Sequence, residues 1–154
     1  MPDVVVKVEG LDRLDALAAD KEFVAGPLRD FLARSAFAVE RFAKEKAPVD
    51  TGRLRTSVAT VLGGTSAVIG PTIFYAPFVE YGTRPHFPPP VALQPWAKRH
   101  GFGPGGAFAL ARAIARRGTR AHPFMRPAAK DALPMIRQNA LQLKRDIEER
   151  WGRG

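Results

Sequence analysis

The sequence predicts one α+β domain that spans residues 1–154. Apolar residues recur at steps of three and four in one stretch near each end of the chain, which predicts two long helices. Between them, two stretches rich in Val, Thr and Ser are separated by Gly63-Gly64, which predicts an antiparallel hairpin as the basis of a sheet. A Pro- and Gly-rich stretch over residues 84–120 is predicted to be a partly helical arm or insertion.

The first elements are predicted before residue 48. Val4 to Val8 is β-branched and predicts a short N-terminal strand, and leucines recur at threes from Leu11 to Leu17, which predicts a small helical turn. The first long helix is predicted to begin with Pro27 as its first residue and to end before Pro48. Its expected apolar stripe is Leu28, Phe31, Leu32, Ser35, Val39, Phe42 and Ala43.

The middle of the chain is predicted to form the hairpin from Leu54–Leu62 and Ala67–Tyr75. The next segment, Tyr75–Gly82, contains Pro77 and fits a short helical turn or an edge element better than a central strand.

The rest of the chain is predicted to be mostly helical. Pro88-Pro89-Pro90 is a stiff spacer, a helical turn is expected over 91–99, a flexible break over 101–106 and a short helix over 107–117. In the final helix Pro134 marks either the start or a kink. The expected stripe of that helix is Ala129, Leu133, Ile136, Ala140, Leu143 and Ile147.

The net charge of +9 is unevenly distributed. Residues 1–50 carry eight basic and ten acidic side chains, residues 51–100 five and one, and residues 101–154 eleven and four. A basic excess of this kind attracts DNA phosphates or an acidic protein surface, although solvated helix faces and solubility explain it equally well.

Nothing in the sequence indicates catalysis. There is no cysteine, the three histidines are fourteen and twenty-two residues apart, and Glu80 is the only acidic residue between Asp50 and Asp131. We therefore expect no catalytic residue, no cofactor and no metal site. The N-terminus lacks the pattern of a signal peptide and no apolar run reaches about 18 residues, so we expect a soluble protein that is intracellular when made.

Two motifs invite a structural interpretation. In Pro48-Val49-Asp50-Thr51-Gly52, Asp50 or Thr51 is expected to cap the turn that begins at Gly52, and Gly52 permits a backbone angle that other residues resist. Arg53 and Arg55 would share one face of an extended segment, where they would pair with Glu80 or another subunit, or contact phosphate.

Apolar side chains of the middle region suggest contacts beyond the domain. Tyr75, Phe78 and Tyr81 recur at threes around Glu80, and this ridge suits either the core or a subunit interface. In the insertion a partner surface is expected to cover Trp96, Phe102 and Phe108. Its basic residues are expected to face an acidic neighbour in preference to DNA; they are Arg112, Arg116, Arg117 and Arg120.

Three segments together resemble a known family. They are APVDTGRLRTS at 47–57, YAPFVEYGT at 75–83 and HPFMRPA at 122–128, and over roughly residues 28–150 they resemble the tail-component family of lambdoid and related siphophages. The first two together are specific, whereas the third alone is weak. The insertion departs from the shortest members, which run almost directly from YGT to PF-x-RPA.

The resemblance implies a virion structural protein of the neck, also called a head–tail joining, tail-completion or minor tail protein. It implies a homo-oligomeric ring, hexameric or alternatively dodecameric, around the DNA passage. The implied partners are head-closure, tail-terminator or tail-tube proteins, with nonspecific DNA contact and no membrane. A small basic nucleic-acid-binding protein is the alternative, and a phage hydrolase has no supporting residues.

Overall fold

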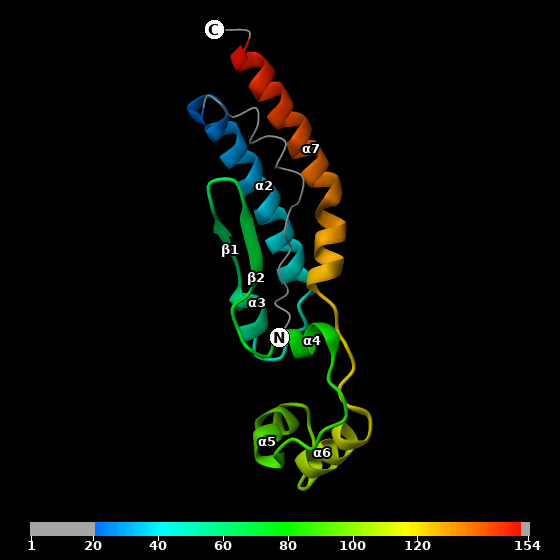
Figure 1. The fold of residues 1–154 in the computed structure, drawn as a ribbon. Helices are drawn as coiled ribbons and strands as arrows, with labels where there is room; N and C mark the ends of the chain where they lie inside the picture. The colour runs from blue at the N-terminus through cyan, green and yellow to red at the C-terminus, as the bar shows by residue number, and fades with distance from the viewer. Residues whose placement is uncertain (1–20, 152–154) are drawn as a thin grey trace. The chain divides into compact units, whose positions relative to one another are not determined.

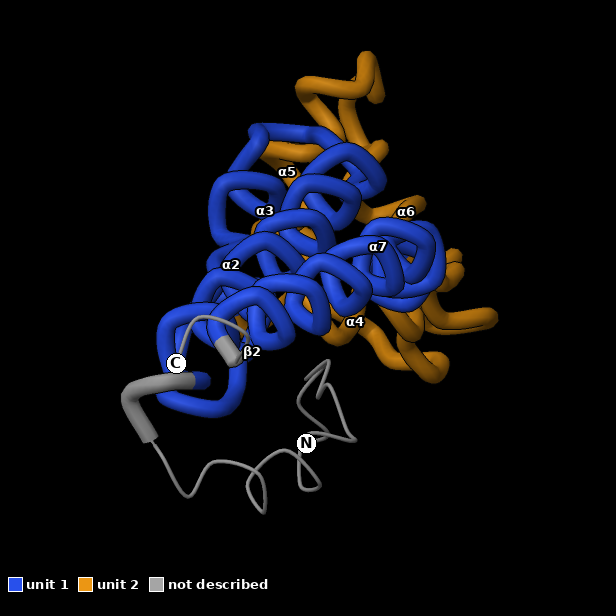
Figure 2. Tube along the Cα trace, turned by 90° about the horizontal axis from the view of Figure 1, so that it is seen from above, with its two compact units in different colours: residues 1–73, 124–154 blue, residues 74–123 orange. Residues whose placement is uncertain are grey.

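The computed structural model describes residues 21–151, so the strand predicted at Val4–Val8 and the turn at Leu11–Leu17 lie outside the described residues. The chain divides into two compact units (Figure 2): unit 1 comprises Met1–Ile73 and Phe124–Gly154, and unit 2 comprises Phe74–Pro123. The described residues form six helices and one two-stranded antiparallel sheet, which agrees with the predicted α+β class.

Unit 1 is built around two long helices, α2 (Lys21–Lys46) and α7 (Met125–Trp151), which lie side by side and run in opposite directions (Figure 1). Apolar residues at steps of three and four give each helix one face to bury against the other. The buried side chains of this helix pair include Leu28, Leu32, Ala36, Val39, Ala43, Met125, Ala128, Ala132 and Leu143.

The hairpin packs against α2 and is formed by β1 (Val58–Leu62) and β2 (Ala67–Pro71). Val58 pairs with Pro71 and Val61 pairs with Val68. Because neighbouring residues of a strand point to opposite faces, Val58 and Ile69 are buried while Val61 and Val68 form an exposed pair. The predicted hairpin is therefore confirmed, with Gly63-Gly64 in its turn.

The first strand begins later than predicted. Residues Arg53–Ser57 form a short helix, α3, so the extended segment starts at Val58 and not at Leu54. The hydroxyls of this helix bond back to its own backbone: Thr56 Oγ1 donates to the Arg53 carbonyl at 3.2 Å and Ser57 Oγ to the Leu54 carbonyl at 2.7 Å. Thr and Ser, which favoured a strand by composition, here stabilise a helical turn locally.

Both long helices differ from prediction in their details. Helix α2 is already helical at Lys21, so Pro27 lies inside it and is not its first residue. Val24 and Pro27 are buried and extend the apolar stripe toward the N-terminus, so packing outweighs the hydrogen bond that the proline removes. Helix α7 begins at Met125 and continues through the exposed Pro134, so of the two predicted alternatives Pro134 is not the start of the helix.

The apolar stripe predicted for α7 is partly wrong. Leu133 and Ala140 are exposed, whereas Met125, Ala128 and Ala132 are completely buried. The buried face is thus turned by about one residue from the predicted one, because it follows the small alanines that allow α7 to approach α2 closely.

Unit 2 contains three helices: α4 (Ala76–Tyr81), α5 (Pro90–Arg99) and α6 (Gly106–Arg117). Of the two alternatives predicted for Tyr75–Gly82, a helical turn or an edge element, the structure shows the helical turn. The helical turn predicted over 91–99 and the helix predicted over 107–117 are confirmed to within a residue or two. Helices α5 and α6 pack on each other, and their buried residues are Ala97, Ala111 and Ile114. The predicted insertion, 84–120, lies within this unit.

Candidate functional site

The junction between α2 and the hairpin is set by Gly52. Its φ of 80° lies in the left-handed region, which confirms the predicted need for a permissive residue. Gly52 itself occupies the N-cap position of α3, where a capping side chain would otherwise stand. Pro48, Asp50 and Thr51 precede it and are exposed.

The two arginines that follow do not share one face as predicted, because Arg53 and Arg55 lie on a helix and not on a strand. Both are exposed. Only Arg55 lines a shallow hollow of unit 1, together with Glu40 and Lys44.

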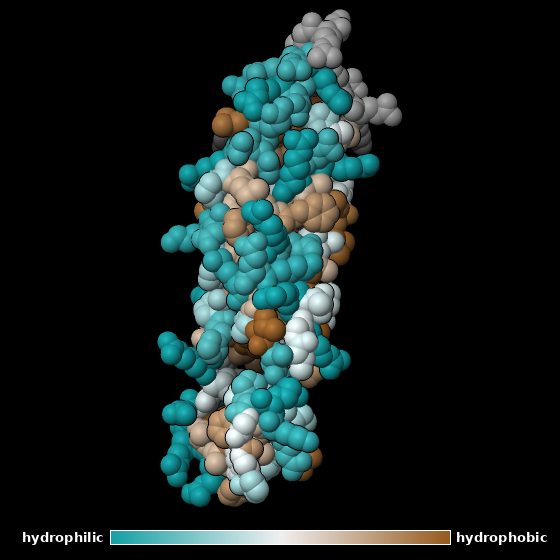
Figure 3. Space-filling model, turned by 180° about the vertical axis from the view of Figure 1, so that it is seen from behind, coloured by the Kyte–Doolittle hydropathy of each residue, from teal (hydrophilic) through white to brown (hydrophobic). Residues whose placement is uncertain are grey.

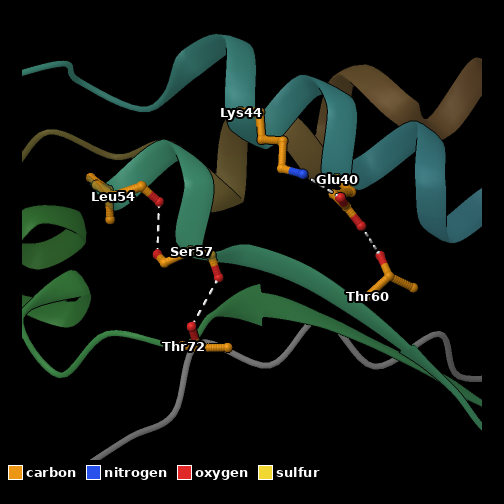
Figure 4. Close-up of polar contacts among 6 residues, drawn as sticks. All are labelled: Glu40, Lys44, Leu54, Ser57, Thr60 and Thr72. Carbon is orange, nitrogen blue, oxygen red and sulfur yellow. Dashed lines mark hydrogen bonds and ion pairs between the residues drawn. The ribbon is translucent and has the colours of Figure 1, made fainter. Parts of the chain in front are cut away.

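Glu40 ties the hairpin to α2 and was not singled out from the sequence. Its carboxylate accepts hydrogen bonds from Lys44 Nζ and from Thr60 Oγ1, each at 2.5 Å (Figure 4). Burial raises the pKa of the Glu40 carboxyl, but the bonds from Lys44 and Thr60 and the Lys44 charge together bring it below the ordinary value of 4.5. The four-residue spacing of Glu40 and Lys44 was the available signal for the ion pair, and nothing pointed to Thr60.

A second link secures the start of the hairpin. The Ser57 carbonyl accepts hydrogen bonds from the backbone nitrogen of Thr72 at 3.0 Å and from Thr72 Oγ1 at 3.2 Å (Figure 4). This junction is therefore fixed by backbone geometry and local hydrogen bonds, which suits the architectural role that the motif predicted.

Helix α4 contains Phe78 and Tyr81 of the predicted aromatic ridge, and Tyr75 is its N-cap residue. Tyr75 is half-buried, whereas Phe78 and Tyr81 are 41% and 47% exposed. Glu80 is 0% exposed, and no buried side-chain oxygen of the described residues lacks a hydrogen-bond partner, so its carboxylate is bonded inside the protein. Replacing Glu80 with alanine would remove a buried, hydrogen-bonded charge and should therefore lower the stability of the fold.

The two ends of the insertion are joined by an antiparallel bridge that the sequence analysis missed. The Thr83 and Thr119 backbones exchange hydrogen bonds of 3.2 and 3.3 Å, and their hydroxyls lie 3.0 Å apart. Gly82 and Gly118 precede them with φ of 73° and 71°. The repeated Gly-Thr dipeptide was the signal that could have revealed this contact.

Aromatic residues of the insertion have partners within unit 2. Trp96 stacks on His100 with ring centroids 3.9 Å apart and lies 5.7 Å from the Phe102 ring. Phe108 meets Phe87 edge to face at 6.2 Å. Trp96 is half-buried, while Phe102 and Phe108 remain about half exposed.

The basic residues of the insertion are all at the surface. Arg112, Arg116, Arg117 and Arg120 are exposed. Arg117 and Arg120 also line a hollow with Leu93, Trp96 and Ile114, whereas Arg112 and Arg116 do not. The structure thus places two of the four arginines beside the apolar side chains of the insertion.

Other kinds of site are not found in the described part of the chain. Residues 21–151 contain no group of three or more His, Asp or Glu side chains placed to hold a metal ion. None of their helices is long and apolar enough to cross a membrane. The face seen in Figure 3 is mainly hydrophilic and carries separate apolar patches.

Comparison with known proteins addresses the predicted resemblance. No curated protein and no solved structure matches this chain. Residues 11–82 match the model of a family described as "Bacteriophage HK97-gp10, putative tail-component". The match includes α2, the hairpin and α4, begins earlier than the resemblance suggested and ends at Gly82, before the element at 122–128. Over residues 11–82, therefore, the predicted resemblance to a phage tail-component family is confirmed.

Proposed function

We propose that this chain is a structural protein of the neck or upper tail of a long-tailed phage virion, where it joins head to tail or completes the tail as a homo-oligomeric ring. The observation that carries the proposal is the family match over residues 11–82. It covers both specific motifs, APVDTGRLR and YAPFVEYG, which in the structure are a rigid junction and a short helix with exposed aromatic residues.

We propose that the chain acts by assembling with other proteins and not by catalysis. Phe78 and Tyr81 are apolar anchors that protrude from α4, and aromatic residues of this kind are enriched at the centres of protein interfaces. Neighbouring head-closure and tail-terminator or tail-tube proteins would then contact the two faces of the ring.

Electron microscopy of the purified chain tests this proposal. We expect closed rings with a central channel, hexameric or dodecameric, and a mass from light scattering that is a matching multiple of the monomer. Particles that remain monomeric at all concentrations would contradict the ring.

A variant in α4 sharpens the test. Tyr81→Ala removes a half-exposed ring and should lower the oligomer fraction, whereas Phe74→Ala, which removes a ring that is 84% exposed outside α4, is the matched control. Equal assembly of both variants would exclude α4 from the contact.

A second candidate function, nonspecific DNA binding, is favoured by the charge of unit 2. Residues 74–123 contain seven basic side chains and a single acidic one, Glu80, which is buried. Binding that depends on phosphates falls steeply with salt. Fluorescence anisotropy with duplex DNA at two salt concentrations would support this candidate if monomers bound DNA at low salt and formed no rings.

A further inference from the structure

Unit 2 contains an apolar groove of about 750 Å³ with basic residues beside it. We call it the basic groove; its main lining residues are Phe78, Leu93, Trp96, Ile114, Arg84 and Arg120. A second hollow, which Arg117 lines, shares Leu93, Trp96, Ile114 and Arg120 with the basic groove, so Arg117 lies close to it. All three arginines are exposed and can meet a ligand.

The charge around the basic groove is not balanced within its own unit. Glu80 is the only carboxylate among residues 74–123, and it is completely buried. The exposed surface of the unit thus carries cations and no anion, so its field favours an acidic ligand.

The apolar part of the groove indicates which acidic ligand fits. A DNA duplex supplies phosphates but no aliphatic side chains that would fill a hollow lined by Leu93, Trp96 and Ile114. A helical peptide with leucines on one side and carboxylates on the other supplies both, and such peptides bind by placing their apolar side in a groove. The groove therefore fits an acidic amphipathic segment better than DNA.

This chain contains one segment of that chemistry. Residues 9–20, EGLDRLDALAAD, carry Leu11, Leu14 and Leu17 at steps of three. They also carry four carboxylates against one basic residue, Arg13. Leucines at such spacing fall on one side of a helix, with most of the acidic residues beside them.

We propose that the basic groove of one copy binds residues 9–20 of a second copy of this chain. Each copy then offers one groove and one segment, so the contact is head-to-tail and closes into a ring when the rotation between copies permits. The proposal rests on the self-assembly proposed above and names the contact that produces it.

Binding in trans is the first test. The host is the full chain with Asp12→Lys and Asp15→Lys, which weaken its own segment, and with Trp151→Phe, so that Trp96 is the one remaining tryptophan. A synthetic peptide of residues 9–20 should change the Trp96 fluorescence in a saturable way.

Charge reversal in the groove should weaken this binding. Arg120→Glu is expected to raise the Kd roughly tenfold. Lys98→Glu makes the same charge change at an exposed residue of α5 that does not line the groove, and it should alter the Kd less than about twofold. Absence of saturable binding, or equal effects of both substitutions, would overturn the proposal.

Mixing two defective chains is the second test. One carries Arg117→Glu and Arg120→Glu, the other Leu14→Glu and Leu17→Glu, and each alone should be monomeric by light scattering. Their mixture retains one intact groove and one intact segment, so it should form a one-to-one dimer. The proposal would be overturned if either variant alone formed oligomers of the wild-type size. It would also be overturned if the peptide bound to chains that never associate, because the segment would then occupy the groove of its own chain.

These outcomes distinguish a failure of the contact between groove and segment from a failure of the proposed ring. Closed rings that persist in both variants would retain the proposed ring and exclude this contact. Dimers in the mixture without closed rings from the wild-type chain would support the contact and contradict the ring.

Discussion

The two units obtain their stability from different interactions. In unit 1 two helices of about seven turns bury a long row of apolar side chains, and the hairpin adds Val58 and Ile69. In unit 2 the helices are short and only Ala97, Ala111 and Ile114 are buried between α5 and α6, so the backbone bridge between Thr83 and Thr119 has a larger share. The stability of unit 2, which has a small core, thus depends on the backbone geometry of the bridge, whereas the stability of unit 1 depends on the packing of its two long helices.

The largest loss of stability is expected from Gly118→Ala, which should disrupt the backbone bridge between Thr83 and Thr119 in unit 2. A Cβ at residue 118 would lie 1.9 Å from the Thr83 carbonyl oxygen at a φ of 71°, so the bridge must open. We expect a loss of roughly 4 kcal/mol in unit 2. Hydrogen exchange should show faster exchange over 83–119 while α2 stays protected. Gly103→Ala, which meets no neighbouring atom, is the control.

Leu32→Ala tests the packing of the core of unit 1. Leu32 is almost completely buried on α2, and its truncation should cost about 3 kcal/mol in the free energy of unfolding. Phe37→Ala, on the same helix but 55% exposed, should cost much less in the same denaturant titration. Equal losses would mean that α2 does not supply the core of unit 1.

Glu80→Ala tests the buried charge of α4. Removing the carboxylate leaves its buried hydrogen-bond partners unsatisfied, so we expect a loss of about 2 kcal/mol. Glu80→Gln keeps part of the hydrogen bonding and should lose less in thermal denaturation. A wild-type Tm for Glu80→Ala would contradict a stabilising role of the buried carboxylate.

Gly52→Val tests the junction of unit 1. Valine at a φ of 80° is strained although the site has open space around it, and the cost should be about 1 to 2 kcal/mol. The Tm should fall before assembly is affected. Normal stability with lost assembly would instead make the junction an interface.

Glu40→Gln should have the smallest effect, below about 1 kcal/mol at pH 7, because the pair with Lys44 is partly exposed. The folded-state pKa of Glu40 lies below 4.5, so its ion pair stabilises the fold above that pH and is lost as the pH falls through the folded-state pKa. The difference in Tm between wild type and Glu40→Gln should therefore shrink on acidification. A difference that is constant down to pH 3 would contradict this role.

Local patterns predicted most of the elements. The stripe from Leu28 to Ala43, the hairpin turn at Gly63-Gly64 and the helices of the insertion follow from spacing and turn residues within a few positions. The contact of Thr83 with Thr119 spans 36 residues and leaves no periodic signal, so it was missed. Burial of Glu80 depends on tertiary packing in the same way, so the sequence left open whether Glu80 lies in the core or at a subunit interface.

The candidate site was predictable only in part. The sequence indicated which residues of the insertion are apolar and which are basic, because these are compositional facts. It could not indicate that Arg120 and Trp96 line one groove while Arg112 does not, since this depends on how α5 and α6 pack. The structure thus shows which of the basic residues predicted for the insertion line the groove.

The bridge between Thr83 and Thr119 also bears on how such a chain can change over generations. The backbone enters and leaves the intervening 35 residues at adjacent points, so their removal or replacement requires only a short turn between the two threonines. A segment closed in this way can be exchanged as a cassette, with its groove and charge altered, while the residues on either side keep their positions.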